Sequence, residues 1–257
     1  MNNFNDDILV SIITPSFNGG KTIKRAFDSV LNQTYNNIEY IVIDNASTDD
    51  TANIVEQYRL KFSEKGIKFS FYSEKDNGLY DAVNKGIKMA SGEIIGYLCT
   101  DDEYEKECFS IVVNAYREHN FDYVYGDLKI VNSNGYEIIK KAKLRKFPST
   151  RNWNQITTFV KSSVLKKLLF DNSTMYGDCD LMLRIRKENC KILVISKTLA
   201  VFHFGGMSTN GGIKQAFRRA KIRNQVYKKN GYQGIILLEG YFIEIAKSIF
   251  SSLKFGK

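Results

Sequence analysis

Two adjacent aspartates, Asp101 and Asp102, follow closely on an apolar segment in the stretch GYLCTDDEY. Two like charges at this spacing repel each other, so either water at a loop tip or a bound cation must compensate them. Carboxylate oxygens are the ligands that hard divalent cations such as Mg²⁺ prefer in proteins. The pair is therefore a candidate cation site, with a solvated loop as the alternative.

Three further acids stand at the ends of expected elements. Asp44 ends an apolar, β-branched run, whereas Asp178 and Asp180 open a helix-like segment. The helix dipole favours carboxylates in a first turn, so capping is the alternative to chemistry for these last two. The chain has two histidines, no HExxH, no GxxxxGK(S/T) and no GxGxxG after its first apolar run. This argues against a zinc enzyme, a P-loop and a common dinucleotide site.

The elements that must position these acids alternate along the first 120 residues or so. Strands are expected over residues 8–16, 38–45, 67–73 and 92–100, and amphipathic helices over 21–33, 51–62, 79–90 and 106–119. This alternation predicts βαβ units and a largely parallel sheet with helices on both faces. Ligands bind at the carboxyl ends of such strands, so the segments TPSFN, DNAS, SEKDNG and TDD are expected to meet at one edge.

The pattern changes after about residue 122. Strands are expected around the turn NSNG, then a strand with a helix from near Ser162, a helix over 178–190, a strand over 191–204, and helices over 212–230 and 234–254. The second half therefore predicts a mixed extension of the sheet, followed by terminal helices.

Charge is concentrated at the C-terminal end. The chain carries +9 overall, and residues 205–257 hold ten Lys or Arg against two Asp or Glu, a net +8. Such a segment predicts an anionic partner: nucleic acid, an anionic membrane surface or a diphosphate-bearing substrate. The four cysteines show no CxxC pairing, and the acidic, polar N-terminus does not look like a signal peptide. Both features favour a cytoplasmic protein with reduced thiols.

The order of segments resembles the family 2 glycosyltransferases of the GT-A fold. The similarity lies in residues 10–51, 76–104, 177–186 (GDCDLMLRIR) and 202–208 (FHFGGMS). The resemblance implies an α/β GT-A catalytic domain over 1–210, with a nucleotide-binding half (1–104) and an acceptor-side half (105–210), and a basic helical extension over 211–257. Gly205, Gly206 and Ser208 are expected to form a loop that closes over the donor.

The resemblance also implies an activity. A sugar would pass from a nucleotide-diphosphate sugar, usually a UDP-sugar, to a glycan or lipid-diphosphate-linked acceptor with inversion, in polysaccharide or glycoconjugate biosynthesis. Asp102 would hold Mn²⁺ or Mg²⁺, Asp101 would serve the ribose or the metal, and His203 would contact the diphosphate or add a metal ligand. Asp178 matches the general base. Nucleic acid is not an expected partner.

Matching positions give the remaining site residues. The nucleotide-sugar contacts implied by the resemblance are Thr14, Pro15, Ser16, Asn18, Asp44, Asn45, Asp81, Asn84 and Asp101. Gln155 would line the acceptor side together with Asp180, for which a structural role is favoured. Two departures stand out: Asn45 replaces the second of two acids that relatives often carry, and Cys99 stands where many relatives have Asn or Asp. The metal site is therefore expected to lack an upstream polar partner.

Two alternatives to a glycosyltransferase remain: a metal-dependent nucleotidyltransferase, and a non-catalytic basic module that binds membrane or nucleic acid. The apolar stretch over residues 234–254 is interrupted by Glu239, Glu244 and Lys247, so spanning a bilayer is not expected. Glu244 is expected on the polar face of this helix. The helix either packs on the catalytic domain or docks on the inner face of the plasma membrane, with basic side chains facing anionic lipid: Arg218, Arg219, Lys221 and Arg223.

Overall fold

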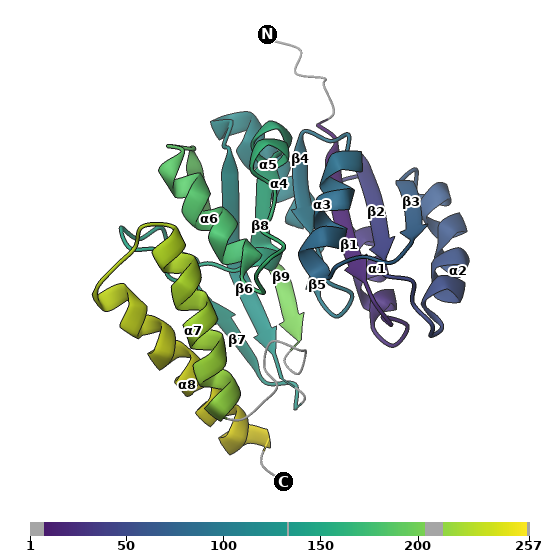
Figure 1. Cartoon of the computed structure of the whole chain (residues 1–257). Coiled ribbons are helices and arrows are strands. Elements are labelled where there is room, and N and C mark those ends of the chain that lie inside the picture. Colours follow the sequence, from purple (N-terminus) through teal and green to yellow (C-terminus); the bar gives the residue numbers. More distant parts are fainter. Residues whose placement is uncertain (1–7, 133, 204–212, 256–257) are drawn as a thin grey trace.

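The computed structural model describes residues 8–132, 134–203 and 213–255, with side chains for all of these except residue 235 and residues 247–255 (Figure 1). The elements follow in the order β1 (Val10–Ser16), α1 (Ile23–Leu31), β2 (Ile38–Asp44), α2 (Thr51–Glu64), β3 (Lys68–Ser73), α3 (Leu79–Met89), β4 (Ile94–Tyr97), β5 (Glu103–Tyr104), α4 (Cys108–His119), β6 (Tyr123–Val131), β7 (Glu137–Lys140), η1 (Gln155–Thr157), β8 (Thr158–Lys161), α5 (Ser162–Leu168), α6 (Gly177–Lys187), β9 (Ile192–His203), α7 (Ile213–Lys229) and α8 (Ile235–Phe255). The expected α/β alternation is confirmed.

One sheet runs through the molecule in the order β3-β2-β1-β4-β8-β6-β9-β5, with β7 paired to β6. The strands β3, β2, β1 and β4 are parallel, as βαβ units require. β8 lies antiparallel between β4 and β6, and β9 is parallel to β6. The expected mixed extension of a mainly parallel sheet is therefore confirmed.

The two faces of the sheet carry separate cores. Helices α1, α2 and α4 cover one face, and α3, α5 and α6 cover the other. The first core contains a cluster of rings in which Phe62 stacks on Phe69, with centroids 4.6 Å apart. This burial on both faces explains why the strands read as nearly continuous apolar runs.

The C-terminal helices pack on α6. Leu183 of α6 meets Val226 and Tyr227 of α7 and Ile236 of α8 in a third apolar cluster. Figure 1 shows α7 and α8 as a hairpin on this side of the molecule, at the opposite end of the sheet from α2. No helix among the described residues is both long enough and apolar enough to cross a bilayer. Packing on the domain, one of the two alternatives for this helix, is what the structure has.

Two of the basic residues expected to face lipid turn inward instead. Arg219 and Arg223 are buried, and both contact Glu244, which is 1% exposed. The Arg219 Nε lies 2.9 Å from one Glu244 oxygen, and the Arg223 Nη1 lies 3.6 Å from the other. The expectation that these two arginines face lipid is wrong, as is the outward placement of Glu244, because α7 and α8 bury their charged residues against each other. Arg218 and Lys221 are exposed.

Candidate active site

The turn after β4 carries the two adjacent aspartates. β4 ends at Tyr97, earlier than expected, so Asp101 and Asp102 lie in a turn and not directly at the strand end. The short strand β5 follows at once and pairs with β9, which anchors the turn. Arg25 of α1 donates its Nη1 hydrogen to the Asp101 carbonyl oxygen at 2.8 Å. Main-chain contacts therefore fix where the two carboxylates lie.

Asp102 is a buried acid that is only partly compensated. Its side chain is 3% exposed, and its Oδ1 has no hydrogen-bond partner among the described residues. Burial, followed by the charge of Asp101, raises the pKa of Asp102 well above its usual range. A buried polar atom without a partner costs about 1–3 kcal/mol, and more when it is charged. A bound cation would remove this cost.

The residues present fit a divalent cation. One carboxylate oxygen each from Asp101 and Asp102 and the sulfur of Cys99 lie within 4.8 Å of one another. His203 does not belong to this group among the described residues. Its Nε2 lies 2.6 Å from a Glu103 oxygen, which ties β9 to β5, and its backbone N–H hydrogen-bonds Asp102. The expectation of His203 as a metal ligand is therefore corrected: its side chain serves the contact between these two strands.

The ends of β1, β2 and β3 meet at the same edge. Asp44, at the end of β2, accepts hydrogen bonds from the Ser47 N–H at 2.9 Å and the Ser73 hydroxyl at 2.8 Å. The Asn18 side chain accepts from the Thr48 N–H at 3.0 Å, and the Asn18 N–H donates to the Ser47 hydroxyl at 2.8 Å. The loops after β1 and β2 are therefore linked to each other, as expected for one binding edge.

Four further predicted residues at this edge differ in whether their polar atoms already have a hydrogen-bond partner. The Asn45 side chain accepts from the Asp76 N–H at 2.8 Å, and the buried Ser16 hydroxyl has no partner. Pro15, which lies between Thr14 and Ser16 in the sequence, is also buried. The Thr14 hydroxyl lies 2.9 Å from the Tyr40 hydroxyl inside the first core. The Thr14 hydroxyl thus has a partner in the core, and its contact with a nucleotide stays a prediction.

On α3, Asp81 and Asn84 have separate roles. Asp81 accepts from the Asn77 N–H at 3.0 Å in the loop before the helix. The Asn84 side chain donates to the Phe170 carbonyl and accepts from the Phe170 N–H, both at 2.9 Å. Asn84 thus bridges α3 to the segment after α5, and its contact with a nucleotide stays a prediction.

Asp178, in the first turn of α6, reaches the same edge from the other half of the chain. Burial and then the charge of Asp178 raise the pKa of Tyr80 well above its usual range, and the two residues are hydrogen-bonded. The charge of Asp178 also contributes to the raised pKa of Cys99, after burial and the two aspartates. Gly177 permits this approach, since a Cβ there would lie 2.8 Å from the Tyr80 ring. Asp178 therefore lies close to the turn that carries Asp102.

The two residues expected on the acceptor side differ in their hydrogen bonds. Asp180 is 1% exposed, with one oxygen 2.7 Å from the Arg184 Nε and the other accepting from the Asn230 side chain at 2.8 Å. It joins α6 to the end of α7, so its role is structural and the acceptor-side alternative is corrected. Gln155 is buried, and its Oε1 has no hydrogen-bond partner among the described residues.

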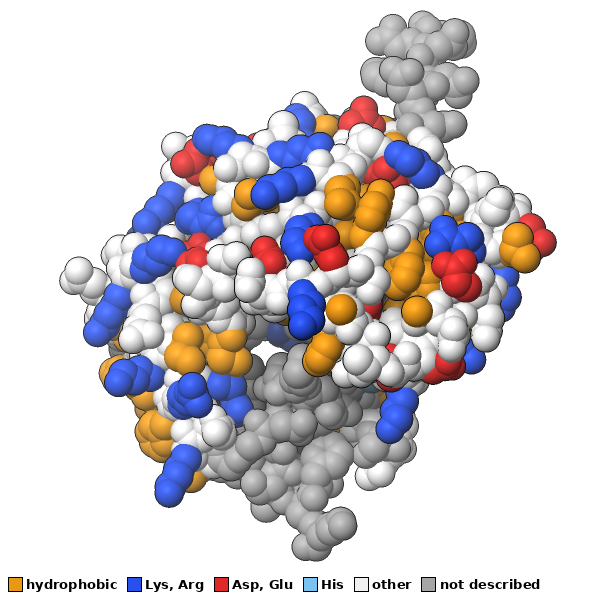
Figure 2. All heavy atoms as spheres, turned by 45° about the vertical axis from the view of Figure 1, so that its right-hand side comes forward, with side chains coloured by type: hydrophobic (Ala, Val, Ile, Leu, Met, Phe, Trp, Pro, Cys, Tyr) orange, Lys and Arg blue, Asp and Glu red, His pale blue; other side chains and the backbone are white. Residues whose placement is uncertain are grey.

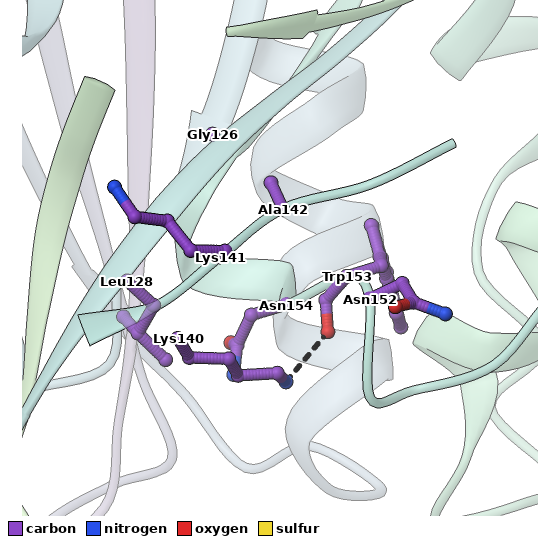
Figure 3. A pocket seen from close by; sticks show the side chains of 8 residues that line it. All are labelled: Gly126, Leu128, Lys140, Lys141, Ala142, Asn152, Trp153 and Asn154. Carbon is purple, nitrogen blue, oxygen red and sulfur yellow. Dashed lines mark hydrogen bonds between the residues drawn. The ribbon is translucent and has the colours of Figure 1, made fainter. Parts of the chain in front are cut away.

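A separate pocket lies between β6, β7 and the segment that follows them (Figure 3). It is lined by Gly126, Leu128, Lys140, Lys141, Ala142, Asn152, Trp153 and Asn154. The Lys140 ammonium donates to the Trp153 carbonyl at 2.8 Å and to the Thr150 carbonyl at 2.7 Å. These bonds hold the loop on the strand, and none of the predicted site residues lines this pocket.

Sequence reasoning missed four residues around the acids. Tyr80 and Tyr97 form a hydrogen-bonded pair behind Asp178, Arg25 holds the turn, and Cys99 faces the doublet. Only Cys99 had a usable signal, its place at a position that is polar in relatives. In the sequence, the two tyrosines occupy apolar positions of an expected helix and an expected strand. Their hydroxyl contacts could therefore not be predicted without the fold.

The family model described as glycosyl transferase family 2 matches residues 11–177. The family match covers Asp44, Asp101 and Asp102 and ends one residue before Asp178. A UDP-Glc:alpha-D-GlcNAc-diphosphoundecaprenol beta-1,3-glucosyltransferase of Escherichia coli is 38% identical over 129 residues, 50% of this chain and 49% of that protein. An uncharacterized glycosyltransferase of Rickettsia typhi is 27% identical over 252 residues, 90% of this chain and 76% of that protein. The chain spans about half the length of the E. coli relative.

Solved structures share the fold at low sequence identity. Staphylococcus aureus TarS 1–349 in complex with UDP-GlcNAc has a TM-score of 0.67 at 20% identity, covering 96% of this chain and 73% of that one. The mannosyltransferase PcManGT from Pyrobaculum calidifontis in complex with GDP-Man and Mn²⁺ has a TM-score of 0.68 at 16% identity, covering 96% and 76%. The expected GT-A fold is confirmed. Because the family model covers more than half of its length, this chain belongs to glycosyl transferase family 2.

Proposed function

We propose that this chain transfers a sugar from a UDP-sugar to a lipid-diphosphate-linked glycan with inversion, using a divalent cation. Family membership supports the transfer of a sugar and disfavours the nucleotidyltransferase and binding-module alternatives. The printed name of the E. coli relative supports UDP-glucose chemistry on a diphosphate-linked lipid acceptor. The observation that carries the proposal is that the charges of two acids from different halves of the chain, Asp102 after β4 and Asp178 on α6, both act on the thiol of Cys99.

The two acids match two requirements of this reaction: the charge that develops on the leaving diphosphate must be neutralised, and the acceptor proton must be removed. A nucleoside diphosphate is a poor leaving group unless its developing charge is neutralised. Asp102 and Asp101 would hold Mn²⁺ or Mg²⁺, which when bound supplies that neutralising charge. The acidic turn itself would repel a diphosphate, so these carboxylates favour donor binding only together with a cation.

Asp178 would act as the general base. In a single displacement, the acceptor oxygen bonds to the anomeric carbon while the bond from that carbon to the diphosphate oxygen breaks. The acceptor proton passes to the Asp178 carboxylate, and the nucleoside diphosphate leaves with the bonding electrons. Attack opposite the leaving group inverts the anomeric carbon. Tyr80 would orient the base, because the two are hydrogen-bonded and the Tyr80 ring is held by stacking on Phe170.

The test is a donor screen followed by a transfer assay. Thermal shift against nucleotides and UDP-sugars with Mn²⁺ identifies the donor, since a ligand that binds only the native state raises the melting temperature. Transfer to a synthetic lipid-diphosphate sugar is then measured, and NMR of the product gives the anomeric configuration. Asp178→Asn should lose transfer while keeping the donor-induced shift, and Glu64→Gln on exposed α2 should keep both. Retention at the anomeric carbon, or full transfer by Asp178→Asn, would refute this mechanism.

A lipid-linked acceptor also calls for membrane contact, which we place on the outer face of α7 and α8. Phe217, Leu238 and Phe242 are 48%, 56% and 66% exposed there, and Lys214, Arg218 and Lys221 are exposed on α7. Figure 2 shows apolar and basic side chains side by side at the lower left, the side of the molecule on which Figure 1 has α7 and α8. Apolar side chains flanked by cations match the chemistry of an anionic lipid surface.

Vesicle flotation tests this contact. Removing α8 would take Glu244 away from two buried arginines, so point variants are the cleaner choice. The full chain should float with phosphatidylglycerol vesicles at low salt, and Phe217→Ser with Phe242→Ser should not. Lys24→Glu on α1 serves as a charge control that keeps flotation. Binding that is equal for phosphatidylcholine vesicles, or unchanged in the Phe variants, would refute the contact.

A further inference from the structure

The thiol of Cys99 faces the two aspartates of the turn after β4. We propose that Cys99 is a third protein ligand of the divalent cation and that its sulfur shifts the preference of the site from Mg²⁺ towards softer cations. This inference rests on the cation site of the proposed function. It reverses the expectation that this chain lacks a partner for the doublet at position 99.

The turn itself brings the sulfur to the carboxylates. The Asp102 N–H donates to the Cys99 carbonyl at 3.2 Å, which folds the doublet back over the end of β4. As a result, the Cys99 sulfur and one oxygen from each aspartate lie within 4.8 Å of one another. Metal bonds to oxygen and sulfur measure about 2.0–2.6 Å, so ligands on opposite sides of one ion are about 4–5 Å apart. A single cation can therefore bridge all three atoms.

Burial gives an independent reason for a ligand at this place. Asp102 is 3% exposed, and its Oδ1 has no hydrogen-bond partner among the described residues, so the group contains a buried carboxylate oxygen that is left for a ligand. The other cysteines differ. Cys108 and Cys179 are packed in apolar cores, and Cys190 is a partly buried residue beside apolar side chains of the second core. Among the residues that the structure describes, Cys99 is the cysteine that lies in a group able to hold a metal ion.

The type of ligand predicts the selectivity. Mg²⁺ is a hard ion that demands near-octahedral oxygen ligands, whereas a thiolate suits softer ions such as Zn²⁺ and Cd²⁺ and is accepted by Co²⁺. Asp or Asn at this position would add an oxygen and favour Mg²⁺ or Mn²⁺. Cysteine keeps the third ligand but changes its softness. The same cation site would then discriminate differently among divalent ions.

Cobalt spectroscopy detects the proposed bond directly. Co²⁺ is titrated into the full chain, with and without UDP, and the near-ultraviolet absorption from thiolate-to-cobalt charge transfer is recorded. We expect this absorption in the unmodified chain and in Cys190→Ser, and its loss in Cys99→Ser. Calorimetric titration should also show that the preference for Cd²⁺ over Mg²⁺ falls by about tenfold or more in Cys99→Ser, and that Cys99→Asp binds Mg²⁺ more tightly than the unmodified chain.

The outcomes separate this inference from the proposed function. Co²⁺ bound with no charge-transfer absorption, and with equal affinity in Cys99→Ser, would overturn the role of the sulfur and leave the aspartate site intact. No Co²⁺ binding to the unmodified chain would overturn both. Melting temperatures check that each variant is folded. Cys99→Asp supplies a second folded comparison if Cys99→Ser is unstable, since loss of the absorption in Cys99→Asp supports the same conclusion.

Discussion

Two buried carboxylates at opposite ends of the parallel strands differ in their surroundings. Glu39, at the amino end of β2, is 2% exposed and accepts hydrogen bonds from Lys68 at 2.6 Å, from the Ser11 hydroxyl at 2.6 Å, and from the N–H and hydroxyl of Ser91, both at 2.7 Å. Asp102, beyond the carboxyl end of β4, is about equally buried, but its Oδ1 has no partner among the described residues. Burial alone does not distinguish these two acids.

The difference lies in what the fold supplies to each carboxylate. Glu39 ties β2 to β1, to β3 and to the turn before β4, so its hydrogen bonds lower its pKa to about 2 even though burial acts to raise it. Burial and then the charge of Asp101 raise the pKa of Asp102, and the His203 N–H and the charge of Arg25 offset this rise only in part. A buried charge without partners costs stability, and such costs are typical of sites that bind or react. We infer that the amino ends of the strands serve stability, and that the carboxyl ends keep an acid ready for a ligand.

The largest effect expected from this comparison is that of Asp102→Asn. The substitution keeps the shape but removes the charge, so cation binding should be lost and sugar transfer should fall by about 10³-fold, as expected when several kcal/mol of transition-state stabilisation is removed. The melting temperature should stay or rise, because an uncompensated buried charge is gone. Transfer assays, calorimetry with Mn²⁺ and thermal unfolding measure the three quantities. Full activity of this variant in the presence of a chelator would contradict the cation mechanism.

Asp180→Asn is the matched control, since Asp180 is as buried as Asp102 but has a partner at each oxygen: Arg184 and Asn230. Here cation binding should persist, and the free energy of unfolding should fall by about 3 kcal/mol, because the guanidinium of Arg184 loses its carboxylate. Equal behaviour of the two variants would show that hydrogen-bond partners do not distinguish the two acids.

The second prediction concerns the C-terminal helices. Glu244→Gln removes the carboxylate that Arg219 and Arg223 both contact at an interface that excludes water. Breaking such a buried network should lower the free energy of unfolding by about 4 kcal/mol, measured by urea denaturation. Glu239→Gln is the control, since this residue is 31% exposed and lies 3.8 Å from Arg151. The control should change stability by less than about 1 kcal/mol.

If Glu244→Gln unfolds at the same urea concentration as the unmodified chain, α7 and α8 are not held by this charge network. The apolar contacts of Leu183 and Val226 would then carry the packing on α6. In that case the exposed outer face of the hairpin would also be less firmly fixed for membrane contact.

The elements of this fold could be predicted from local patterns, but several of its contacts could not. Periodicity and turn residues are local signals, and the expected strand over 38–45 and helix from Ser162 agree with β2 and α5. The insertion of β8 between β4 and β6 depends on pairing between distant segments, which no local pattern encodes. A helical wheel drawn for α8 alone assigns Glu244 to solvent, because the wheel does not contain α7.

The candidate site likewise has features that the sequence predicted and features that it could not predict. Asp44 and Asp102 follow two strands of the sheet, so its α/β topology was enough to expect them at one edge, whereas Asp178 was expected in the site only from the resemblance to the family. The hydrogen-bond partners of each acid could not be predicted from the sequence. Arg184 and Asn230, for example, contact Asp180 only in the folded chain. Which acids are compensated, and therefore which are structural, is a property of the packed molecule.

The smallest expected effect completes the comparison at the amino end of the sheet. Because the pKa of Glu39 is lowered from 4.5 to about 2, its bonds stabilise the protein above pH 4.5, and this stability should be lost as the pH falls from 4.5 towards 2. Lys68 is 64% exposed, so solvent screening limits the loss to about 2 kcal/mol. Glu39→Gln should therefore be less stable at pH 7, and its free energy of unfolding should decline less steeply as the pH falls from 4.5 towards 2, measured by urea denaturation at a series of pH values.

Glu56→Gln is the control. It removes a surface pair with Arg59, and its stability should follow the pH profile of the unmodified chain. Parallel profiles for Glu39→Gln and the unmodified chain would show that the four hydrogen bonds do not couple Glu39 to folding.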